Sequence, residues 1–218
     1  MEGNMTTSPT PVYPPSPWNL HAQGYLSAWA LPSGELPELP AGITALTVKG
    51  TAFVFTAWID YQPPGQLAYH ELLAAVVVHN RHSGLSGRRP TVSITGIWVD
   101  SEVSLAGGRQ LWAIPKGLAS LDFTTGGHFT AVASTAEDWI ATAAFAPRRG
   151  LPFAPPHRFA IAQGRNGLPL VTPVRSSGKP APASASWHIN PAGPLGFLAG
   201  RKPLFSAHLR DVALQFGD

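Results

Sequence analysis

The stretch that decides the fold runs from Trp98 to Ala119 and reads WVDSEVSLAGGRQLWAIPKGLA. It places one lysine, Lys116, among apolar residues. The apolar residues nearest to it in sequence are Leu111, Trp112, Ala113, Ile114 and Leu118. Pro115 fixes its own φ angle and biases Ile114 away from helix, so Lys116 is expected to leave a defined bend.

A buried lysine in this setting has two interpretations. A lysine amine attacks a carbonyl carbon only when it is unprotonated, and with an ordinary pKa of about 10.4 only about one amine in 10³ is competent at pH 7. Burial favours the neutral form, so we expect burial to lower the pKa of Lys116 and to make it a nucleophile. In the alternative interpretation Lys116 is a turn lysine, whose stem lies along a sheet while its amine reaches water.

Composition restricts the class of protein. Charged residues make up 12% of the 218 residues and the aliphatic and aromatic residues 44%. Because so few charges accompany so much apolar sequence, we expect part of the surface to be buried in a homo-oligomer. The formal charge is only +3, and the arginines are dispersed apart from two adjacent pairs. A nucleic-acid binder would need a denser basic stripe, so no nucleic-acid partner is expected.

Several other classes are not indicated. The chain has no cysteine, which excludes disulfides. The first thirty residues hold no apolar segment typical of a signal peptide, and no run of about 18 apolar residues occurs, so we expect a cytoplasmic protein with no membrane contact. No spacing of His with Asp or Glu typical of a metal site is found on a recognisable helix, and we expect neither a metal nor a cofactor.

The pattern along the chain favours strands. Residues 1–17 are rich in Ser, Thr and Pro and predict an extended N-terminal arm, followed by a single domain over residues 18–218. A single helical turn is expected within residues 101–107, with Ser101 as its N-cap, and Gly107-Gly108 is interpreted as a tight turn. Strands are predicted over residues 20–29, 43–49, 51–60, 68–78, 91–99, 121–123, 128–134, 137–145, 158–163, 170–175, 184–189 and 204–216. Many short strands with frequent turn residues indicate a mainly β barrel or sandwich around one cavity.

The same stretch resembles the acetoacetate decarboxylase family. The matching residues are Asp100-Ser-Glu102, Gly108-Arg109-Gln110-Leu111, Pro115-Lys116 and Leu118, without gaps. Tyr69-His70-Glu71 is similar to the family's Tyr-x-Glu, residues 21–26 resemble its first pocket strand, and the similarity extends over most of residues 14–218. The resemblance implies a cone-shaped β-barrel, or double-layered antiparallel sheets, with few short helices, an apolar pocket and assembly into oligomers.

The resemblance also implies roles for individual residues. Lys116 would be the lysine that forms a Schiff base with a small-molecule keto substrate, and Glu71 the carboxylate that transfers protons. Arg109 is expected to hold the Lys116 segment rigid by pairing with Asp100 or Glu102. The side chains expected to contact the substrate are His21, Gln23, Thr56, Tyr69, Trp98 and Trp112.

Three positions depart from the decarboxylase pattern. Gln23 stands where the decarboxylases carry an arginine, Thr56 where they carry a second glutamate, and Gly117 where a second lysine follows the nucleophile. The reactive amine is kept while the acetoacetate-specific polar groups are lost. The sequence therefore favours a Schiff-base lyase, acting as an aldolase-dehydratase or as a decarboxylase on a keto substrate other than acetoacetate. The alternative is a non-covalent small-molecule binder or cyclase that uses the same pocket.

Overall fold

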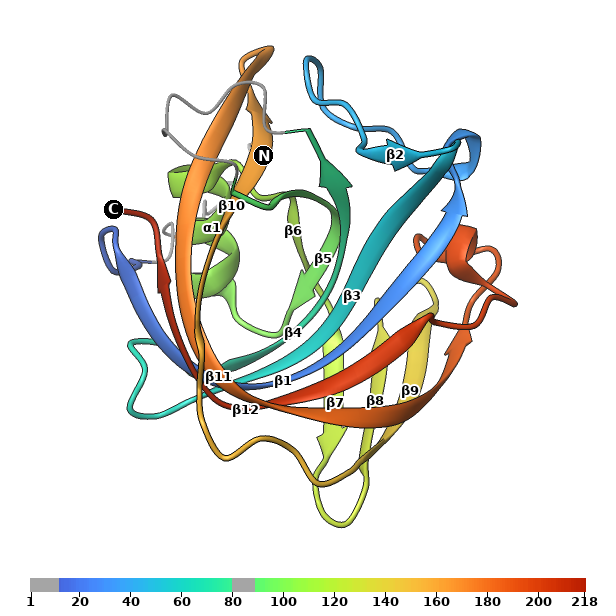
Figure 1. The fold of residues 1–218 in the computed structure, drawn as a ribbon. Helices are drawn as coiled ribbons and strands as arrows, with labels where there is room; N and C mark the ends of the chain where they lie inside the picture. Colours follow the sequence, from blue (N-terminus) through green and yellow to red (C-terminus); the bar gives the residue numbers. More distant parts are fainter. Residues whose placement is uncertain (1–11, 80–88) are drawn as a thin grey trace, which may run out of the picture.

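The structure, a computed structural model, describes residues 12–79 and 89–218, and these residues are mainly in β-strands (Figure 1). The first half of the chain forms β1 (Trp18–Pro32), β2 (Thr47–Val48), β3 (Thr51–Gln62), β4 (Tyr69–Val78), β5 (Thr91–Val99), α1 (Glu102–Trp112) and β6 (Lys116–Leu118). The second half forms β7 (Ser120–Thr124), β8 (Phe129–Ser134), β9 (Trp139–Pro147), β10 (Pro156–Arg165), β11 (Leu168–Ile189) and β12 (Phe205–Phe216). Two short 3₁₀ helices, Ser33–Glu35 and Gly196–Leu198, lie in connections.

The strands form one large twisted sheet. Its order is β10-β5-β4-β3-β1-β12-β11-β9-β8-β7, with β2 beside β3 and β6 beside β5. The sheet curls so far that β10 pairs with both β5 and β11, in parallel with β5 and antiparallel to β11. Figure 1 shows α1 on the inner side of this curl, next to β5 and β6. The expected mainly β fold is confirmed.

The two faces of the sheet have different surroundings. One face packs against β7, β8 and β9 in a filled core, which we call the packed core; its largest members include Trp29, Trp58, Leu72, Phe129 and Phe145. The other face, with residues of α1, forms a second apolar cluster that includes Trp18, Tyr69, Ile97, Trp112 and Val212. Because side chains alternate across a strand, each long strand contributes to both clusters.

Three sequence predictions about local structure were wrong. The strand expected over residues 43–49 is reduced to β2 and one isolated bridge at Ala45. The strands expected over residues 170–175 and 184–189 are one strand, β11, because the Ser177–Lys179 segment forms a bulge against β12 instead of a turn. The expected helical turn is an eleven-residue helix, α1, and Gly107-Gly108 lies inside it.

The N-terminal arm is described only from residue 12, and residues 1–11 lie outside the described part. Tyr13 donates a hydrogen bond to the Gln110 side chain of α1 at 2.5 Å, and Trp18 Nε1 donates to the Pro14 carbonyl at 2.8 Å. The described end of the arm therefore packs against α1. No helix within residues 12–79 and 89–218 is long and apolar enough to cross a membrane.

Candidate active site

The turn after α1 places Lys116 at the edge of the sheet. The helix begins after Ser101, whose side chain accepts a hydrogen bond from the Ser104 backbone N–H at 3.2 Å, as an N-cap does. It ends at Ala113, which adopts a left-handed conformation with φ 54° and returns its N–H to carbonyls of the last turn. Pro115 follows, and Lys116 then pairs in parallel with Ile97 of β5.

The amine of Lys116 is enclosed by three oxygen atoms. Nζ donates hydrogen bonds to Glu71 Oε2 at 2.8 Å, to Ser104 Oγ at 2.8 Å and to the Tyr69 hydroxyl at 3.3 Å. Lys116 is 4% exposed and Glu71 is 3% exposed, so this is a buried ion pair. The other oxygen of Glu71, Oε1, accepts a hydrogen bond from the Tyr61 hydroxyl at 3.3 Å. The alternative in which the amine reaches open water is therefore excluded.

Two residues of α1 fix the rest of the lysine. A Cβ atom at Gly108 would lie 2.8 Å from both Cδ and Cε of Lys116, so only glycine lets the lysine stem cross the helix here. Arg109 Nε donates to the backbone carbonyl of Lys116 at 2.7 Å. Within the described residues Arg109 makes no ion pair with Asp100 or Glu102, and Asp100 binds His70 instead. Arg109 holds the lysine segment as expected, but through a carbonyl.

The protonation of this cluster differs from the expectation. Burial lowers the pKa of Lys116, but the Glu71 carboxylate and the Tyr69 hydroxyl raise it, and the net shift of the pKa is upward. The expected lowered pKa was wrong because a carboxylate lies within 2.8 Å of the amine. Burial raises the pKa of Tyr69 to about 12, so its hydroxyl stays protonated. The resting site is an ammonium–carboxylate pair flanked by neutral hydroxyls.

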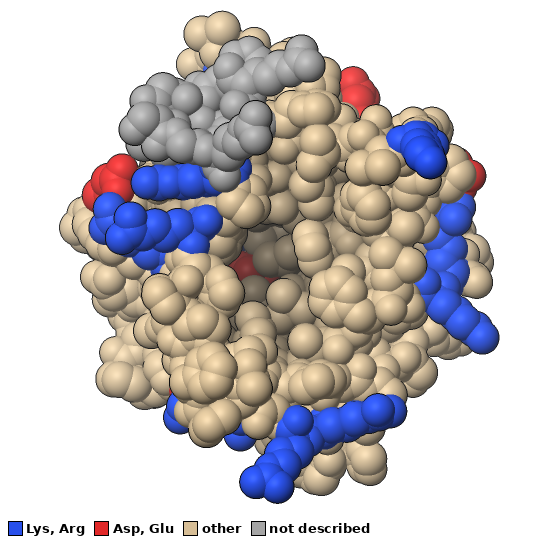
Figure 2. Space-filling view, in the orientation of Figure 1, with Lys and Arg blue, Asp and Glu red and all other residues tan. Residues whose placement is uncertain are grey.

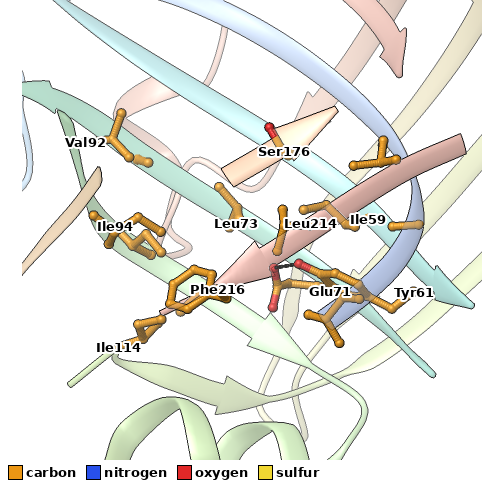
Figure 3. A pocket seen from close by; sticks show the side chains of 18 of the residues that line it. Ile59, Tyr61, Glu71, Leu73, Val92, Ile94, Ile114, Ser176, Leu214 and Phe216 are labelled. Atoms are coloured by element: carbon orange, nitrogen blue, oxygen red, sulfur yellow. Dashed lines mark hydrogen bonds between the residues drawn. The ribbon is translucent and has the colours of Figure 1, made fainter. Parts of the chain in front are cut away.

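A cavity of about 370 Å³ opens onto this pair. Figure 2 shows the face of the protein hollowed at its centre, with acidic atoms at the bottom, and Glu71 is the only acidic residue in the described lining. The walls come from alternate residues of β1, β3, β4, β5 and β12, and they are almost entirely aliphatic or aromatic. Figure 3 shows Tyr61 and Glu71 among Ile59, Leu73, Leu214 and Phe216. The arrangement offers one amine and one carboxylate at the wall of an apolar chamber.

Comparison with known proteins agrees with this geometry. The family model described as acetoacetate decarboxylase (ADC) matches residues 39–174. The chain belongs to the acetoacetate decarboxylase family. No curated protein matches this sequence.

Several solved structures share the fold. The acetoacetate decarboxylase of Legionella pneumophila subsp. pneumophila str. Philadelphia 1 is 18% identical with a TM-score of 0.69, over 100% of this chain and 94% of that one. The enduracididine biosynthesis enzyme MppR, solved with pyruvate, is 17% identical with a TM-score of 0.64, over 94% and 89%. MppR has also been solved with the condensation product of pyruvate and imidazole 4-carboxaldehyde. An acetoacetate decarboxylase-like enzyme from Sphingomonas wittichii RW1 is 12% identical with a TM-score of 0.63, over 100% and 97%.

In this family member the structure brings together only some of the predicted site residues. Lys116, Glu71, Tyr69 and Trp112 line the cavity. Gln23 and His21 do not, because on β1 the cavity is lined by Ala22, Gly24 and other alternate residues. Gln23 instead hydrogen-bonds Asp211 on the opposite face of the sheet.

Thr56 and Trp98 are also absent from the cavity lining. Thr56 accepts a hydrogen bond from Trp29 Nε1 at 2.9 Å in the packed core. Trp98 lies against Gly117 and contacts the packed core, while its neighbour Ile97 faces the cavity. These two expected substrate contacts are corrected, since a shift of one residue along a strand moves a side chain to the other face.

Three polar residues of the site were not predicted: Ser104, Tyr61 and Ser176. Ser104 is fully buried and bonds Lys116, and its position three residues after a capping serine was the one available sequence signal. Tyr61 is the next residue but one to Ile59 on β3, so the alternation that places Ile59 in the cavity also places Tyr61 there. Ser176 lies in the merged strand β11 that the sequence divided in two. No described residues form a group of three or more acidic or His side chains arranged to hold a metal ion.

Proposed function

We propose that this protein forms a Schiff base between Lys116 and a small-molecule ketone or aldehyde, and acts as a lyase of the aldolase-dehydratase or decarboxylase type. The observation that carries the proposal is the buried amine 2.8 Å from the Glu71 carboxylate at the wall of an apolar cavity. An amine nucleophile with an adjacent base is the arrangement that covalent catalysis by lysine requires. Pyruvate binding by the related MppR supports a carbonyl compound as the ligand class.

The neutral amine is generated inside the pair. Water in the cavity stabilises the charged form of both groups, and a substrate that displaces this water favours transfer of one proton from Nζ to Glu71 Oε2. The distance of 2.8 Å between these atoms allows direct transfer. Ser104 and Tyr69 each accept a hydrogen bond from the amine and so hold its remaining protons away from the cavity.

Schiff-base formation then needs no proton from outside the Lys116–Glu71 pair. The nitrogen lone pair attacks the carbonyl carbon and the C=O π bond opens. The oxygen receives one proton from the nitrogen and one from protonated Glu71, and the C–O bond then breaks to release water. An iminium ion replaces the ammonium ion, and the Glu71 carboxylate remains its counter-charge. The iminium draws the electron pair of an adjacent C–H or C–C bond toward nitrogen. Removal of the C–H proton by Glu71 gives an enamine that can attack an aldehyde, whereas cleavage of the C–C bond releases carbon dioxide or a second carbonyl compound.

A second candidate function is non-covalent binding in the same cavity. The upward shift of the pKa of Lys116 favours it, because the resting amine is an ammonium ion and can serve as a fixed hydrogen-bond donor. The two functions differ in what the lysine contributes. Covalent chemistry needs the nitrogen lone pair, while a binding role needs only a donor.

Reductive trapping separates the two functions. The protein is incubated with pyruvate, acetone and larger ketones, reduced with borohydride and measured by intact mass. We expect a stable mass increase that is absent from Lys116→Ala and from borohydride alone. Absence of an adduct with every carbonyl compound, together with unchanged ligand affinity in Lys116→Ala, would refute the Schiff-base proposal and favour the binding role.

We also propose that the protein assembles into homo-oligomers. Large apolar side chains are exposed on the described surface, including Phe153 at 58%, Leu168 at 70%, Leu204 at 61% and Phe205 at 57%. Exposed apolar patches are typical of surfaces that another subunit covers, and we propose that these side chains belong to such a surface. Light scattering at micromolar concentration should give a multiple of the monomer mass, and a single monomer mass would remove this proposal.

A further inference from the structure

We infer that the cavity selects an uncharged, mainly apolar ketone or aldehyde and discriminates against keto acids. This inference rests on the proposed function and specifies its substrate class. It favours the aldolase-dehydratase form of that function, because decarboxylation would need a keto acid. It is drawn from the charges, the volume and the position of polar groups in the described cavity lining.

The charge balance of the cavity leaves nothing to receive a substrate carboxylate. Lys116 is the only cationic residue in the described lining, which contains no Arg and no His. Its charge is already matched by Glu71 at 2.8 Å. Formation of the iminium keeps that balance, since one cation replaces another beside the same carboxylate. A keto acid would therefore bring a second negative charge into an apolar chamber without a partner, which is strongly unfavourable.

The acidic group itself increases this discrimination. Besides Lys116, the polar lining groups around this pair are the Tyr61 and Tyr69 hydroxyls, which are neutral: burial and Glu71 raise the pKa of Tyr61 well above its usual value, and burial raises the pKa of Tyr69 to about 12. Neither hydroxyl can neutralise a second carboxylate. A substrate carboxylate bound beside Glu71 would face like charge in a medium of low dielectric constant, where such repulsion costs several kcal/mol.

The volume and the walls favour a larger substrate than a four-carbon acid. At about 30 Å³ for each water-sized group, a cavity of 370 Å³ has room for about a dozen non-hydrogen atoms. The walls include Ile59, Leu73 and Leu214, which Figure 3 shows near Glu71 on the side of Ser176. An aliphatic chain attached to the carbonyl carbon would bury its surface on these side chains, at about 25 cal/mol for each Å².

One neutral polar side chain marks the far part of the cavity. Ser176 of β11 lies away from the Tyr61–Glu71 hydrogen bond in Figure 3. Its hydroxyl can donate to or accept from an ester, a hydroxyl or a second carbonyl, but it cannot compensate a charge. The lining thus tolerates an uncharged polar group at a distance from the reacting carbonyl.

A matched set of carbonyl compounds tests this inference. The set contains 2-nonanone, 8-oxononanoate and methyl 8-oxononanoate, which share a methyl ketone and differ in charge and end group. The wild-type protein is loaded with 1-naphthol, an uncharged fluorescent probe small enough for the cavity, and each compound is titrated as a competitor. Each is also trapped with borohydride. We expect the ketone and the ester to compete and to be trapped at least tenfold more effectively than the acid.

The possible outcomes separate this inference from the proposed function. Equal or better competition and trapping by the acid would overturn the inference and leave the Schiff-base proposal intact. If no compound is trapped, pyruvate and acetone included, the Schiff-base proposal fails, while the order of probe displacement still decides the charge preference of the cavity. A failure of the probe to bind at micromolar concentration would overturn the inference, because an apolar cavity of this size should hold it.

A variant of the cavity wall provides the converse test. Leu73 follows Glu71 on the same face of β4 and lines the cavity. Leu73→Arg supplies the missing cation, and Leu73→Met is the neutral control of similar volume. We expect Leu73→Arg to reduce the preference for the ketone over the acid at least tenfold, and Leu73→Met to keep the preference. If the arginine variant does not fold, the wild-type comparison of acid with ester remains decisive.

Discussion

Substitution of Gly108 by alanine is expected to displace the reactive amine while leaving the fold intact. The added Cβ would lie 2.8 Å from Cδ and Cε of Lys116, whereas ordinary contact begins at 3.4 Å, so the stem must retreat by at least the difference of 0.6 Å. This retreat lengthens the 2.8 Å bond between Nζ and Glu71 toward 3.4 Å, outside the usual hydrogen-bond range of about 2.7–3.2 Å. A misplacement of about 1 Å at a reacting group can cost about 10²-fold in rate, so we expect adduct formation to slow about tenfold.

The stability of the same variant should change little. Alanine gains about 1 kcal/mol of helix propensity over glycine, and overpacking costs about 1–3 kcal/mol, so the two effects nearly cancel. The assay is the rate of borohydride-trapped adduct at fixed ketone concentration, with urea unfolding measured in parallel. Gly117→Ala is the control, because the nearest atom to its Cβ would be Trp98 Cδ1, at 3.3 Å, and its rate should stay within about twofold. An unchanged rate in Gly108→Ala would refute the reasoning.

Three further predictions concern charge and position. Glu71→Gln removes the carboxylate that raises the pKa of Lys116 while burial remains, so borohydride trapping should extend to lower pH. Turnover should nevertheless fall about 10²-fold or more, because the group that carries the proton is lost. An unchanged pH profile of trapping would contradict this prediction. Arg109→Lys removes the 2.7 Å hydrogen bond to the Lys116 carbonyl, so the free energy of unfolding should fall by about 1 kcal/mol and borohydride trapping should slow. An unchanged trapping rate would show that this contact is not needed to position Lys116. Burial, with Arg210, lowers the pKa of His208 to about 4, so the neutral form stabilises the fold above pH 6.5 and this contribution is lost as the pH falls toward 4. Allowing for the partial exposure of His208, the free energy of unfolding in urea should fall by about 1 kcal/mol over this pH range. The His208→Gln variant should not show this fall. Equal pH dependence of stability in both proteins would contradict the prediction.

The alternation of apolar and polar residues, together with one local motif, made much of the fold predictable from sequence. Strands β3, β4 and β5 begin and end within two residues of their predicted limits, because β-branched and aromatic runs there are bounded by glycine, proline or polar turns. The Ser101 cap was predicted correctly, but the length of α1 was not. Gly107 and Gly108 are unfavourable in a helix, and tertiary contacts decide their place: added Cβ atoms would meet Trp18 and Lys116.

The candidate site was predictable where it depends on one local segment. Lys116 and Glu71 are 45 residues apart, and the family resemblance, not the local pattern, brought them together. The resemblance to the family placed Gln23 and Thr56 in the pocket. In the structure both side chains point away from the cavity, because the pairing register of their strands sets which face each residue occupies. The raised pKa of Lys116 could not be predicted either, since neighbours in sequence reveal burial but not a carboxylate contributed by another strand.

The most direct test of the central claim is the location of the reduced adduct by peptide mass mapping. The chain has four lysines, and only Lys116 is both buried and paired with a carboxylate in the cavity. After incubation with an uncharged ketone and borohydride, the account predicts one modified peptide containing Lys116 and none containing Lys49, Lys179 or Lys202. Modification spread over the exposed lysines, with Lys116 unmodified, would contradict the account.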